Sequence, residues 1–450
     1  MQSDPRLPFA ISKSDLPLHE RLADAIEQAI SSGSLSVGDR VPTHREISSH
    51  YGVAIGTVTK AVDSLSRRGI VRGEVGRGTF VQSSVPVAAE VVDLTINAPL
   101  PVIKPDIMYA AAERASRVSL EMPNGGYVDL TGTPQQRSTV AEWLSKTRFE
   151  CVAEDLILCV GAQQAIHLAF AELGQSSPGI ATEMHSFPGA IAAAKNLGMT
   201  MHGVRYDDEG MLPDDLDDVL KSSKAKIVYL TPVCQNPLSL EMSQSRRERI
   251  LAVCRKHDAF IVEDDIYGFY ATNGSPTFKQ LEPDRVFYLT SLSKCLTPLM
   301  RLGALFPPRQ YRQALARRMR AEVWGPAPFA VNVGCALLDL GAYDSAVVSL
   351  RAESSERLAL AHRIFGPALP ELERVAPHFW LPMGVLDAER LARRASEQNI
   401  RLTSPSASAV SDDAPGGIRI CVLSTRRQTD LERALRSVKE LMDTSEEAAI

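Results

Sequence analysis

The sequence predicts a small, mainly helical domain with a β-hairpin, followed by a large α/β domain with a mainly parallel sheet. Within residues 17–82, apolar residues recur at helical spacing in three short stretches, and a glycine-tipped pair of strands follows them. From Asp106 onward, strand-like and helix-like patterns alternate over about 300 residues, as they do in βαβ units. A chain of 450 residues is long enough for each domain to bury its own core.

The composition is that of a globular protein without a membrane span or a disulfide framework. Hydrophobic residues make up 44% of the chain and charged residues 23%. No uninterrupted apolar run reaches about 18 residues, and the N-terminus lacks the pattern of a signal peptide. The seven cysteines are scattered and form no C-x-x-C pair. We therefore expect a cytoplasmic protein with no metal site.

The charge is distributed unevenly along the chain. The net charge is −5, yet residues 40–82 hold seven Lys and Arg residues against three acidic residues. A basic stretch at one end of an acidic chain is typical of a nucleic-acid-binding module. A solvated charged face would have the same composition, so charge alone does not decide between them.

Three short helices are expected in the first domain. The first follows an apolar pattern over residues 18–30. Thr43 and Glu46 form a capping box, in which each side chain accepts a hydrogen bond from a backbone N–H at the start of a second helix. A third helix follows a tight turn and ends near Arg68.

A hairpin follows the third helix. Two short strands at residues 70–72 and 79–81 flank Gly76-Arg77-Gly78. Three helices and a hairpin in this order make a winged helix-turn-helix, whose third helix lies in the major groove of DNA. The wing arginine, Arg77, is placed to reach a phosphate or the minor groove. We assign residues 1–82 to this domain.

Residues 17–82 resemble the GntR family of bacterial regulators. The matching segments are Pro42-Thr-His-Arg45-Glu46, Gly52-Val53, Gly56-Thr57-Val58 and Gly76-Arg-Gly-Thr-Phe80. The resemblance implies that Arg45, Thr57 and Gly76 contact double-stranded DNA. Ala54-Ile55 stands where the family commonly has Ser-Arg, so its usual operator preference is not carried over. Use of the winged helix for protein contacts is the alternative.

Residues 83–98 are expected to form a linker between the two domains. The stretch contains Pro86 and lacks a helical period. The α/β domain is then assigned to residues 99–450, and residues 431–450 are expected to form a last helix with a frayed end.

Lys294 is the candidate reactive residue of the α/β domain. An apolar strand at residues 285–289 runs into Ser291-Leu-Ser-Lys294. Open α/β sheets bind ligands at the carboxyl ends of their strands, and lysine is seldom buried there without a partner. A desolvated lysine amine can form a Schiff base with an aldehyde. A surface lysine in a serine-rich loop is the alternative.

Three more strands end at residues suited to the same site. The strand at 156–160 runs into Gly161-Ala162-Gln163, and a helix N-terminus there would offer N–H groups to a phosphate. Asn236 follows a second strand and can donate to a phenolic oxygen. Asp264 ends a third strand, three residues before Tyr267, and a carboxylate there can keep a pyridine nitrogen protonated. Each of these residues alone is equally typical of a cap or turn.

Together these motifs resemble the fold-type I pyridoxal 5′-phosphate (PLP) enzymes of the aminotransferase superfamily, across roughly residues 95–445. The resemblance implies that Lys294 forms the internal aldimine, that Asp264 pairs with the pyridinium, and that Asn236 and Tyr267 hold the ring oxygen O3′. It further implies roles for five other residues: phosphate binding by Ser291, Arg301 and the backbone of Ala162 and Gln163, and ring stacking by Phe187.

Arg419 falls where this superfamily binds the α-carboxylate of its substrate. A guanidinium suits that role because it can donate two parallel hydrogen bonds to one carboxylate. Ile418 and Ile420 on either side indicate a strand rather than a surface loop.

A winged helix joined to an aminotransferase-like domain resembles the MocR subfamily of GntR regulators over nearly the whole chain. The resemblance implies a bacterial transcription factor that forms a head-to-tail homodimer. Gly132-Thr-Pro-Gln-Gln136 and Thr131 depart from the usual pattern near the cofactor, so we expect weaker cofactor binding than in a transaminase.

Three functional hypotheses follow. The leading one is a PLP-dependent transcriptional regulator that senses an amino-acid or amine effector at Lys294 and Arg419. The second is a working PLP-dependent aminotransferase that carries a DNA-binding domain. The third is a sensor of PLP itself. The sequence does not identify the effector, the operator, or whether the regulator activates or represses.

Overall fold

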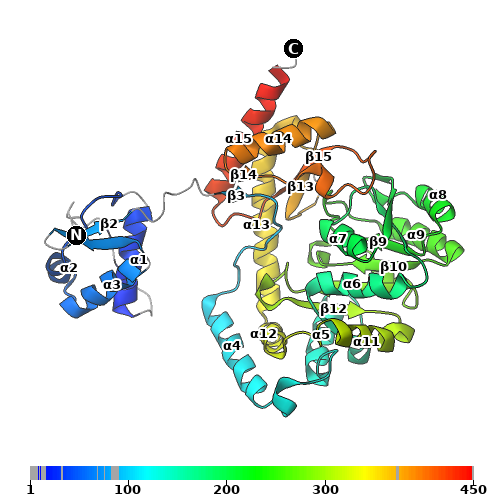
Figure 1. Cartoon of the computed structure of the whole chain (residues 1–450), viewed down its shortest axis with the longest axis horizontal. Coiled ribbons are helices and arrows are strands. Elements are labelled where there is room, and N and C mark those ends of the chain that lie inside the picture. Colours follow the sequence, from blue (N-terminus) through cyan, green and yellow to red (C-terminus); the bar gives the residue numbers. More distant parts are fainter. Residues whose placement is uncertain are drawn as a thin grey trace. The chain divides into compact units, whose positions relative to one another are not determined.

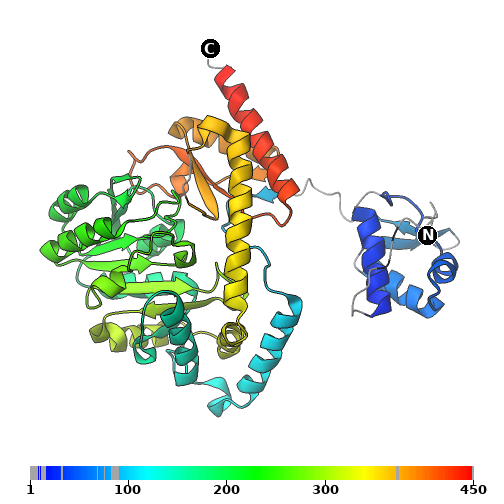
Figure 2. The ribbon, with the colours of Figure 1, turned by 180° about the vertical axis from the view of Figure 1, so that it is seen from behind.

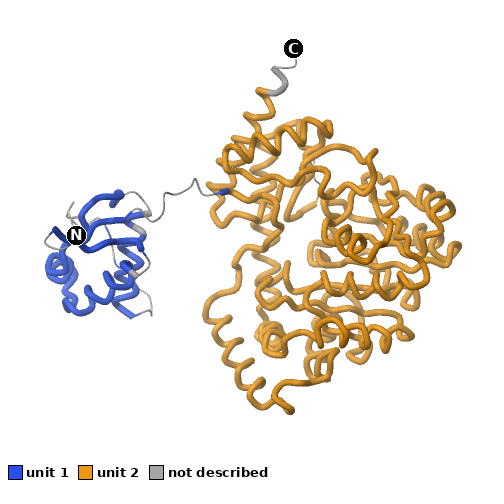
Figure 3. Tube along the Cα trace, viewed as in Figure 1, with its two compact units in different colours: residues 1–91 blue, residues 92–450 orange. Residues whose placement is uncertain are grey.

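The computed structural model describes residues 9, 11, 17–31, 34–67, 69–74, 77–82, 91–370 and 374–447. The chain forms two compact units, Met1–Val91 and Val92–Ile450, which are coloured separately in Figure 3.

The first unit is a winged helix-turn-helix, as the sequence predicts. Its core consists of fully buried aliphatic side chains that come from all three helices, including Leu22, Ile47 and Val58. The two strands pair antiparallel, with Val71 opposite Val81. Its elements are α1 (Leu18–Ser31), α2 (His44–Tyr51), α3 (Ile55–Arg67), β1 (Val71–Glu74) and β2 (Gly78–Val81).

The predicted capping box is present at the start of α2. The Thr43 hydroxyl accepts a hydrogen bond from the Glu46 backbone N–H at 3.3 Å, and the Glu46 carboxylate accepts one from the Thr43 N–H at 2.6 Å. Gly52 ends the helix with a left-handed φ of 64°. The local sequence therefore defines both ends of α2.

The linker prediction was wrong in its second half. Residues 83–90 lie outside the described residues, but Val92–Asp93 form strand β3, which pairs in parallel with β14 (Ile400–Arg401). The second unit accordingly begins at Val92 rather than at residue 99. A two-residue strand carries no detectable period, which is why the pattern resembled a linker.

A seven-stranded sheet forms the centre of the second unit. Its strand order is β4-β12-β11-β10-β9-β5-β6, and β12 is the strand that runs antiparallel to its neighbours. The expected mainly parallel sheet is thus confirmed. Its strands are β4 (Ile157–Val160), β5 (Gly179–Glu183), β6 (Thr200–Val204), β9 (Ile227–Leu230), β10 (Phe260–Asp264), β11 (Val286–Ser291) and β12 (Leu302–Phe306).

Helices cover both faces of this sheet (Figure 1). Along β11, Phe287 and Leu289 pack in the cluster that includes α6 and α11, whereas Val286 packs among residues of α8, α9 and α10 on the other face. This alternation follows from the period of two in a strand. The helices are α4 (Pro105–Leu120), α5 (Pro134–Thr147), α6 (Gly161–Leu173), α7 (Pro188–Asn196), α8 (Pro213–Ser223), α9 (Gln244–His257), α10 (Phe278–Leu281), α11 (Arg312–Glu322) and α12 (Pro328–Asp339).

A smaller α/β subdomain completes the second unit. Its core cluster joins the antiparallel pair β13–β15 to α14 and α15, and the long helix α13 packs along it (Figure 2). The last helix begins three residues earlier than predicted. The remaining elements are α13 (Ala342–Phe365), α14 (Val385–Glu397), α15 (Gln428–Glu447), β13 (His378–Pro382), β15 (Gly417–Cys421), and the short pair β7 (Tyr206–Asp207) and β8 (Gly210–Met211).

Within the described residues, no single helix is long and apolar enough to cross a membrane, although α12 and α13, bent by 79°, pass that test as a pair.

Loss of the capping box should destabilise α2 selectively. The Thr43→Ala substitution removes the hydroxyl that accepts from the Glu46 N–H. Helix α2 should therefore lose about 1 kcal/mol of stability, and its amide hydrogens should exchange about fivefold faster in the full chain. Thr277→Ala, which removes the equivalent capping box of α10, is the matched control and should leave exchange in α2 unchanged. Equal exchange rates in α2 for Thr43→Ala and the parent protein would contradict this account.

Candidate functional site

A cavity of about 310 Å³ lies at the carboxyl ends of the parallel strands. Its size is within the range of small-molecule sites. The structure brings all ten predicted residues of the α/β domain to its wall: Ala162, Gln163, Phe187, Asn236, Asp264, Tyr267, Ser291, Lys294, Arg301 and Arg419. Strands that run in parallel end at one edge of the sheet, and this explains why residues so distant in sequence meet there.

Lys294 lies just beyond β11 with its amine inside the cavity. The ammonium donates a hydrogen bond to the backbone carbonyl of Asn97. Burial, together with the nearby cations of Arg419 and Arg301, lowers the pKa of Lys294 to about 8. The uncharged, nucleophilic form of the amine is therefore far more populated near neutral pH than in an ordinary lysine, although the ammonium form still predominates.

Asp264 ends β10 and faces the same cavity. Its carboxylate accepts hydrogen bonds from the Tyr229 hydroxyl at 2.8 Å and from the Ile266 N–H at 3.3 Å. Burial raises the pKa of Asp264 to about 6, while the hydrogen bond from Tyr229 acts in the opposite direction. An anion in this position is suited to pairing with a cationic ring nitrogen.

One end of the cavity is suited to an anion. Helix α6 begins at Gly161, whose φ is +71°, and a Cβ atom there would lie 3.3 Å from the Arg301 guanidinium. Glycine therefore permits the arginine to approach the helix N-terminus. Within the described part of the chain, the Arg301 guanidinium donates no hydrogen bond. Ser291 accepts from the Ser293 N–H at 3.1 Å and donates to the Leu302 carbonyl at 2.8 Å.

Arg419 lies on β15, as predicted, with its side chain buried. Its Nη1 donates to Asn236 Oδ1 at 2.7 Å, and its Nη2 donates to Thr403 Oγ1 at 3.2 Å and to the Thr95 carbonyl. All of these acceptors are neutral. The guanidinium is thus a buried cation without an anionic partner among the described residues, a position that favours binding of an anion.

Two family matches cover the chain. Residues 89–438 match the family described as aminotransferase class I and II, and residues 18–81 match the bacterial regulatory proteins of the gntR family. The chain belongs to the aminotransferase class I and II family, and the two matches together are consistent with the MocR subfamily of GntR-type regulators.

Relatives of the chain are named as regulators. The uncharacterized HTH-type transcriptional regulator YdeF of Bacillus subtilis is 23% identical over 445 residues, 96% of both chains. The probable rhizopine catabolism regulatory protein MocR of Rhizobium meliloti is 26% identical over 340 residues, 68% of both chains. The pyridoxine biosynthesis regulator PdxR of Corynebacterium glutamicum is 26% identical over 337 residues, 69% of this chain and 70% of that one.

Solved structures of aminotransferases share the fold of the second unit. The kynurenine aminotransferase of Pyrococcus horikoshii superposes with a TM-score of 0.70 at 21% identity, over 80% of this chain and 92% of that one. LysN, the α-aminoadipate aminotransferase of Thermus thermophilus, gives 0.69 at 22% identity, over 79% and 92%.

A polar relay in the cavity, formed by Asn97, Tyr267 and His378, has no counterpart among the sequence predictions. Asn97 Nδ2 donates to the Tyr267 hydroxyl at 2.9 Å and lies 2.7 Å from His378 Nδ1. His378 Nε2 donates to the Gln235 carbonyl at 3.2 Å. Burial lowers the pKa of His378 to about 3, so its ring is neutral and its Nδ1 accepts from Asn97. Asn97 was assigned to the linker, and none of its partners is close in sequence.

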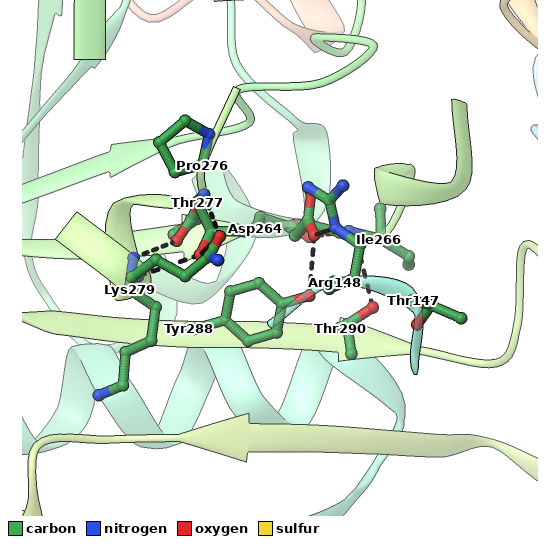
Figure 4. A network of polar contacts seen from close by, with 12 residues as sticks. Thr147, Arg148, Asp264, Ile266, Pro276, Thr277, Lys279, Tyr288 and Thr290 are labelled. Carbon is green, nitrogen blue, oxygen red and sulfur yellow. Dashed lines mark hydrogen bonds and ion pairs between the residues drawn. The ribbon is translucent and has the colours of Figure 1, made fainter. Parts of the chain in front are cut away.

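A buried ion pair holds the residue that directly follows β10 (Figure 4). Arg148 donates to both oxygens of Asp265, at 2.6 and 3.0 Å, and the Tyr288 hydroxyl donates to the same carboxylate at 2.8 Å. The Thr290 hydroxyl donates to the Asp265 carbonyl at 3.2 Å. These contacts fix the end of the strand that carries Asp264.

The predicted DNA-contacting residues lie on the expected elements of the first unit. Arg45 is exposed on α2, and Thr57 lies in the first turn of α3. Arg77 follows β1 with its side chain 75% exposed and pairs with Glu74 at 2.9 Å. Gly76 lies outside the described residues.

Thr131, one of the departures from the family pattern, does not line the cavity. Its hydroxyl donates to Asp129 at 2.8 Å and accepts from Arg137 at 3.0 Å, so it belongs to the support of the adjoining loop.

Removal of Arg148 should destabilise the second unit strongly. Arg148→Met leaves the Asp265 carboxylate buried without its cation, which costs about 3–5 kcal/mol of unfolding free energy. Arg309→Met is the control, because Arg309 forms an ion pair with Asp155 but is 75% exposed, and its loss should cost at most about 1 kcal/mol. Urea denaturation of both variants measures the difference. Similar losses in the two variants would show that the buried pair does not support the strand.

Proposed function

We propose that the chain is a PLP-dependent transcriptional regulator that binds operator DNA through its winged helix and senses an amino-acid or amine effector in the cavity. The observation that carries the proposal is a half-buried lysine and a buried arginine that line one cavity, in a chain that also holds a GntR domain; the arginine has no anionic partner among the described residues.

The cavity residues fit PLP in three respects. The Lys294 amine is desolvated, Asp264 offers a carboxylate for the pyridine nitrogen, and the Gly161 turn with Arg301 and Ser291 offers an anion site for the phosphate. Bound PLP would supply an aldehyde whose carbon joins the Lys294 nitrogen with loss of one water.

The other predicted contacts complete this arrangement. The Tyr267 hydroxyl accepts from Asn97 and keeps its own hydrogen available for O3′, beside Asn236. Phe187 would stack on the ring, and the backbone of Ala162 and Gln163 would donate to the phosphate. Arg419 would bind the carboxylate of the effector, which is the anion that its buried position favours.

The first unit would bind double-stranded DNA through Arg45, Thr57, Gly76 and Arg77. Two units that each read one half-site are typical of such regulators, and we place the protein in the cytoplasm as a head-to-tail homodimer. Exposed apolar side chains on α4, including Tyr109 at 74% and Leu120 at 88%, support an interface on the second unit.

An aminotransferase that carries a DNA-binding domain is the second candidate. The aminotransferase fold of the second unit favours it, and the naming of the relatives as regulators favours the first. A sensor of PLP alone would have no use for Arg419, although PdxR, named for pyridoxine biosynthesis, is among the relatives.

Lys294→Ala should abolish the visible absorption band that PLP gives when it is bound by the parent protein, because no other amine in the cavity can replace it. Any effect of amino acids on DNA affinity should be lost with it. Lys279→Met is the matched control, since Lys279 is also a buried lysine but bonds the Pro283 and Val286 carbonyls away from the cavity.

The same titration separates the candidates. A band that shifts persistently with one amino acid supports a regulator, and release of a keto acid with pyridoxamine phosphate supports an enzyme. An unchanged band in Lys294→Ala would overturn the cofactor assignment.

Tyr229→Phe should weaken PLP binding about tenfold, because the hydroxyl stabilises the Asp264 carboxylate by roughly 1.4 kcal/mol. Tyr288→Phe removes a similar buried hydrogen bond, to Asp265 on the outer side of β10, and should leave PLP affinity unchanged. Spectroscopic titration with PLP measures both. Equal affinities in Tyr229→Phe and Tyr288→Phe would show that Tyr229 does not act on the cofactor site.

A further inference from the structure

The segment of residues 92–97, called the strap below, joins the cavity to the chain that leads to the DNA-binding unit. It begins with β3, directly after residues 83–91, and Thr95, Ile96 and Asn97 line the cavity. A movement of the strap is therefore passed by the covalent chain to the segment before it.

Two cations of the cavity hold the strap through its backbone. Lys294 donates to the Asn97 carbonyl, and Arg419 donates to the Thr95 carbonyl. These are the two residues that the proposed function assigns to the ligands. Each of these two carbonyls thus accepts a hydrogen bond from a group that would otherwise contact a ligand.

The strap is also held by the Asn97 side chain, by the ion pair of Asp93 with Arg401 and by Leu94, which is fully buried in the core, together with three backbone bonds. The Val92 N–H donates to the Asn399 carbonyl at 2.9 Å, the Leu94 N–H to Arg401 at 3.0 Å, and the Cys421 N–H to Leu94 at 3.0 Å. A two-residue strand at this position depends on its other contacts, because so short a pairing is marginal by itself.

A carboxylate on Arg419 must compete with Thr95. Parallel hydrogen bonds from a guanidinium to a carboxylate use Nη2 together with Nη1 or Nε. Both hydrogens of Nη2 are engaged, one by Thr95 and one by Thr403, and only Thr95 of these two lines the cavity. Nε of Arg419 has no partner among the described residues, so the Thr95 carbonyl is the acceptor in the cavity wall that a carboxylate would have to replace to use Nε and Nη2 together.

We propose that the strap is a ligand-displaced element: the carboxylate of the effector takes Arg419 from the Thr95 carbonyl, the pairing of β3 with β14 loosens, and the linker transmits this change to the DNA-binding unit. The inference rests on the proposed function and names its regulation. With PLP bound, Lys294 would not be available to the Asn97 carbonyl, and an effector amine in place of Lys294 would make it available again. Loss of the hydrogen bond between Arg419 and the Thr95 carbonyl is therefore the change that reports effector binding.

The first test uses two probes that differ in one group. N-(5′-phosphopyridoxyl)-L-alanine carries the carboxylate, and N-(5′-phosphopyridoxyl)ethylamine lacks it. Neither reacts with Lys294, so both leave that amine free. With the full chain, the alanine probe should speed amide exchange in residues 92–97 about fivefold or more, and the ethylamine probe should not. Equal exchange with both bound probes would overturn the role of the carboxylate.

The second test fixes the strap in place. Asp93 and Arg401 are paired in register, and both side chains reach the surface. Asp93→Cys with Arg401→Cys should form a disulfide that holds β3 on β14, since paired strands have Cα separations in the range that a disulfide needs. A Cys151→Ser background is suitable because Cys151 is the one native cysteine that is not buried.

DNA affinity is then measured with a duplex selected by the protein from a randomised pool. In the reduced protein, the alanine probe should change the affinity about fivefold or more, and oxidation should abolish that change without abolishing probe binding. The reduced form is the matched control, because it carries the same substitutions.

The two proposals fail in different ways. If the oxidised protein responds to the alanine probe as strongly as the reduced protein, the strap does not transmit the signal, while the proposed function stands. If the parent protein binds the probe and its DNA affinity does not change, the proposed regulation itself is wrong.

Discussion

Most of the site depends on the parallel arrangement of β4, β5, β9, β10 and β11, because strands that run in one direction bring their last residues to one edge of the sheet. Asp264 ends β10, and Lys294 lies three residues beyond β11. The single reversed strand, β12, begins at that same edge, so Arg301 arrives there at the start of a strand rather than at an end. Strand direction therefore decides which residues can act together.

The charges at this edge have partners of different kinds. Asp265 is paired with the Arg148 cation and also accepts from Tyr288. Asp264, Lys294 and Arg419 are instead hydrogen-bonded by neutral groups only. A charge held by neutral groups gains more from an oppositely charged ligand than a charge that already has an ionic partner, so these three residues are the ones suited to ligand contacts.

The sequence was sufficient to predict those site residues that lie next to a recognisable apolar strand. Lys294 and Asp264 follow apolar strands, and Arg419 lies between two isoleucines, so the local pattern predicted their elements, while their roles came from the resemblance to the PLP enzymes. Tyr229 is different. It lies inside an apolar strand, and only the pairing of β9 with β10 brings its hydroxyl to Asp264.

Asn97 could not be predicted for a related reason. Its partners Tyr267 and His378 are 170 and 281 residues away, and the segment that carries it has no helical or strand period. The pattern of a linker and the pattern of an extended segment held by distant side chains are the same in a single sequence. Only the contacts distinguish them.

Because His378 is neutral, the donor and acceptor of each hydrogen bond in the relay are fixed. Because burial keeps the pKa of this imidazole at about 3, its ring nitrogens retain their donor and acceptor roles throughout the range in which cells live. The side-chain amide of Asn97 therefore keeps one orientation as the pH changes, with Nδ2 donating to His378 Nδ1 and to the Tyr267 hydroxyl. The hydrogen bonds among Asn97, Tyr267 and His378 therefore keep one arrangement over the whole pH range in which His378 is neutral.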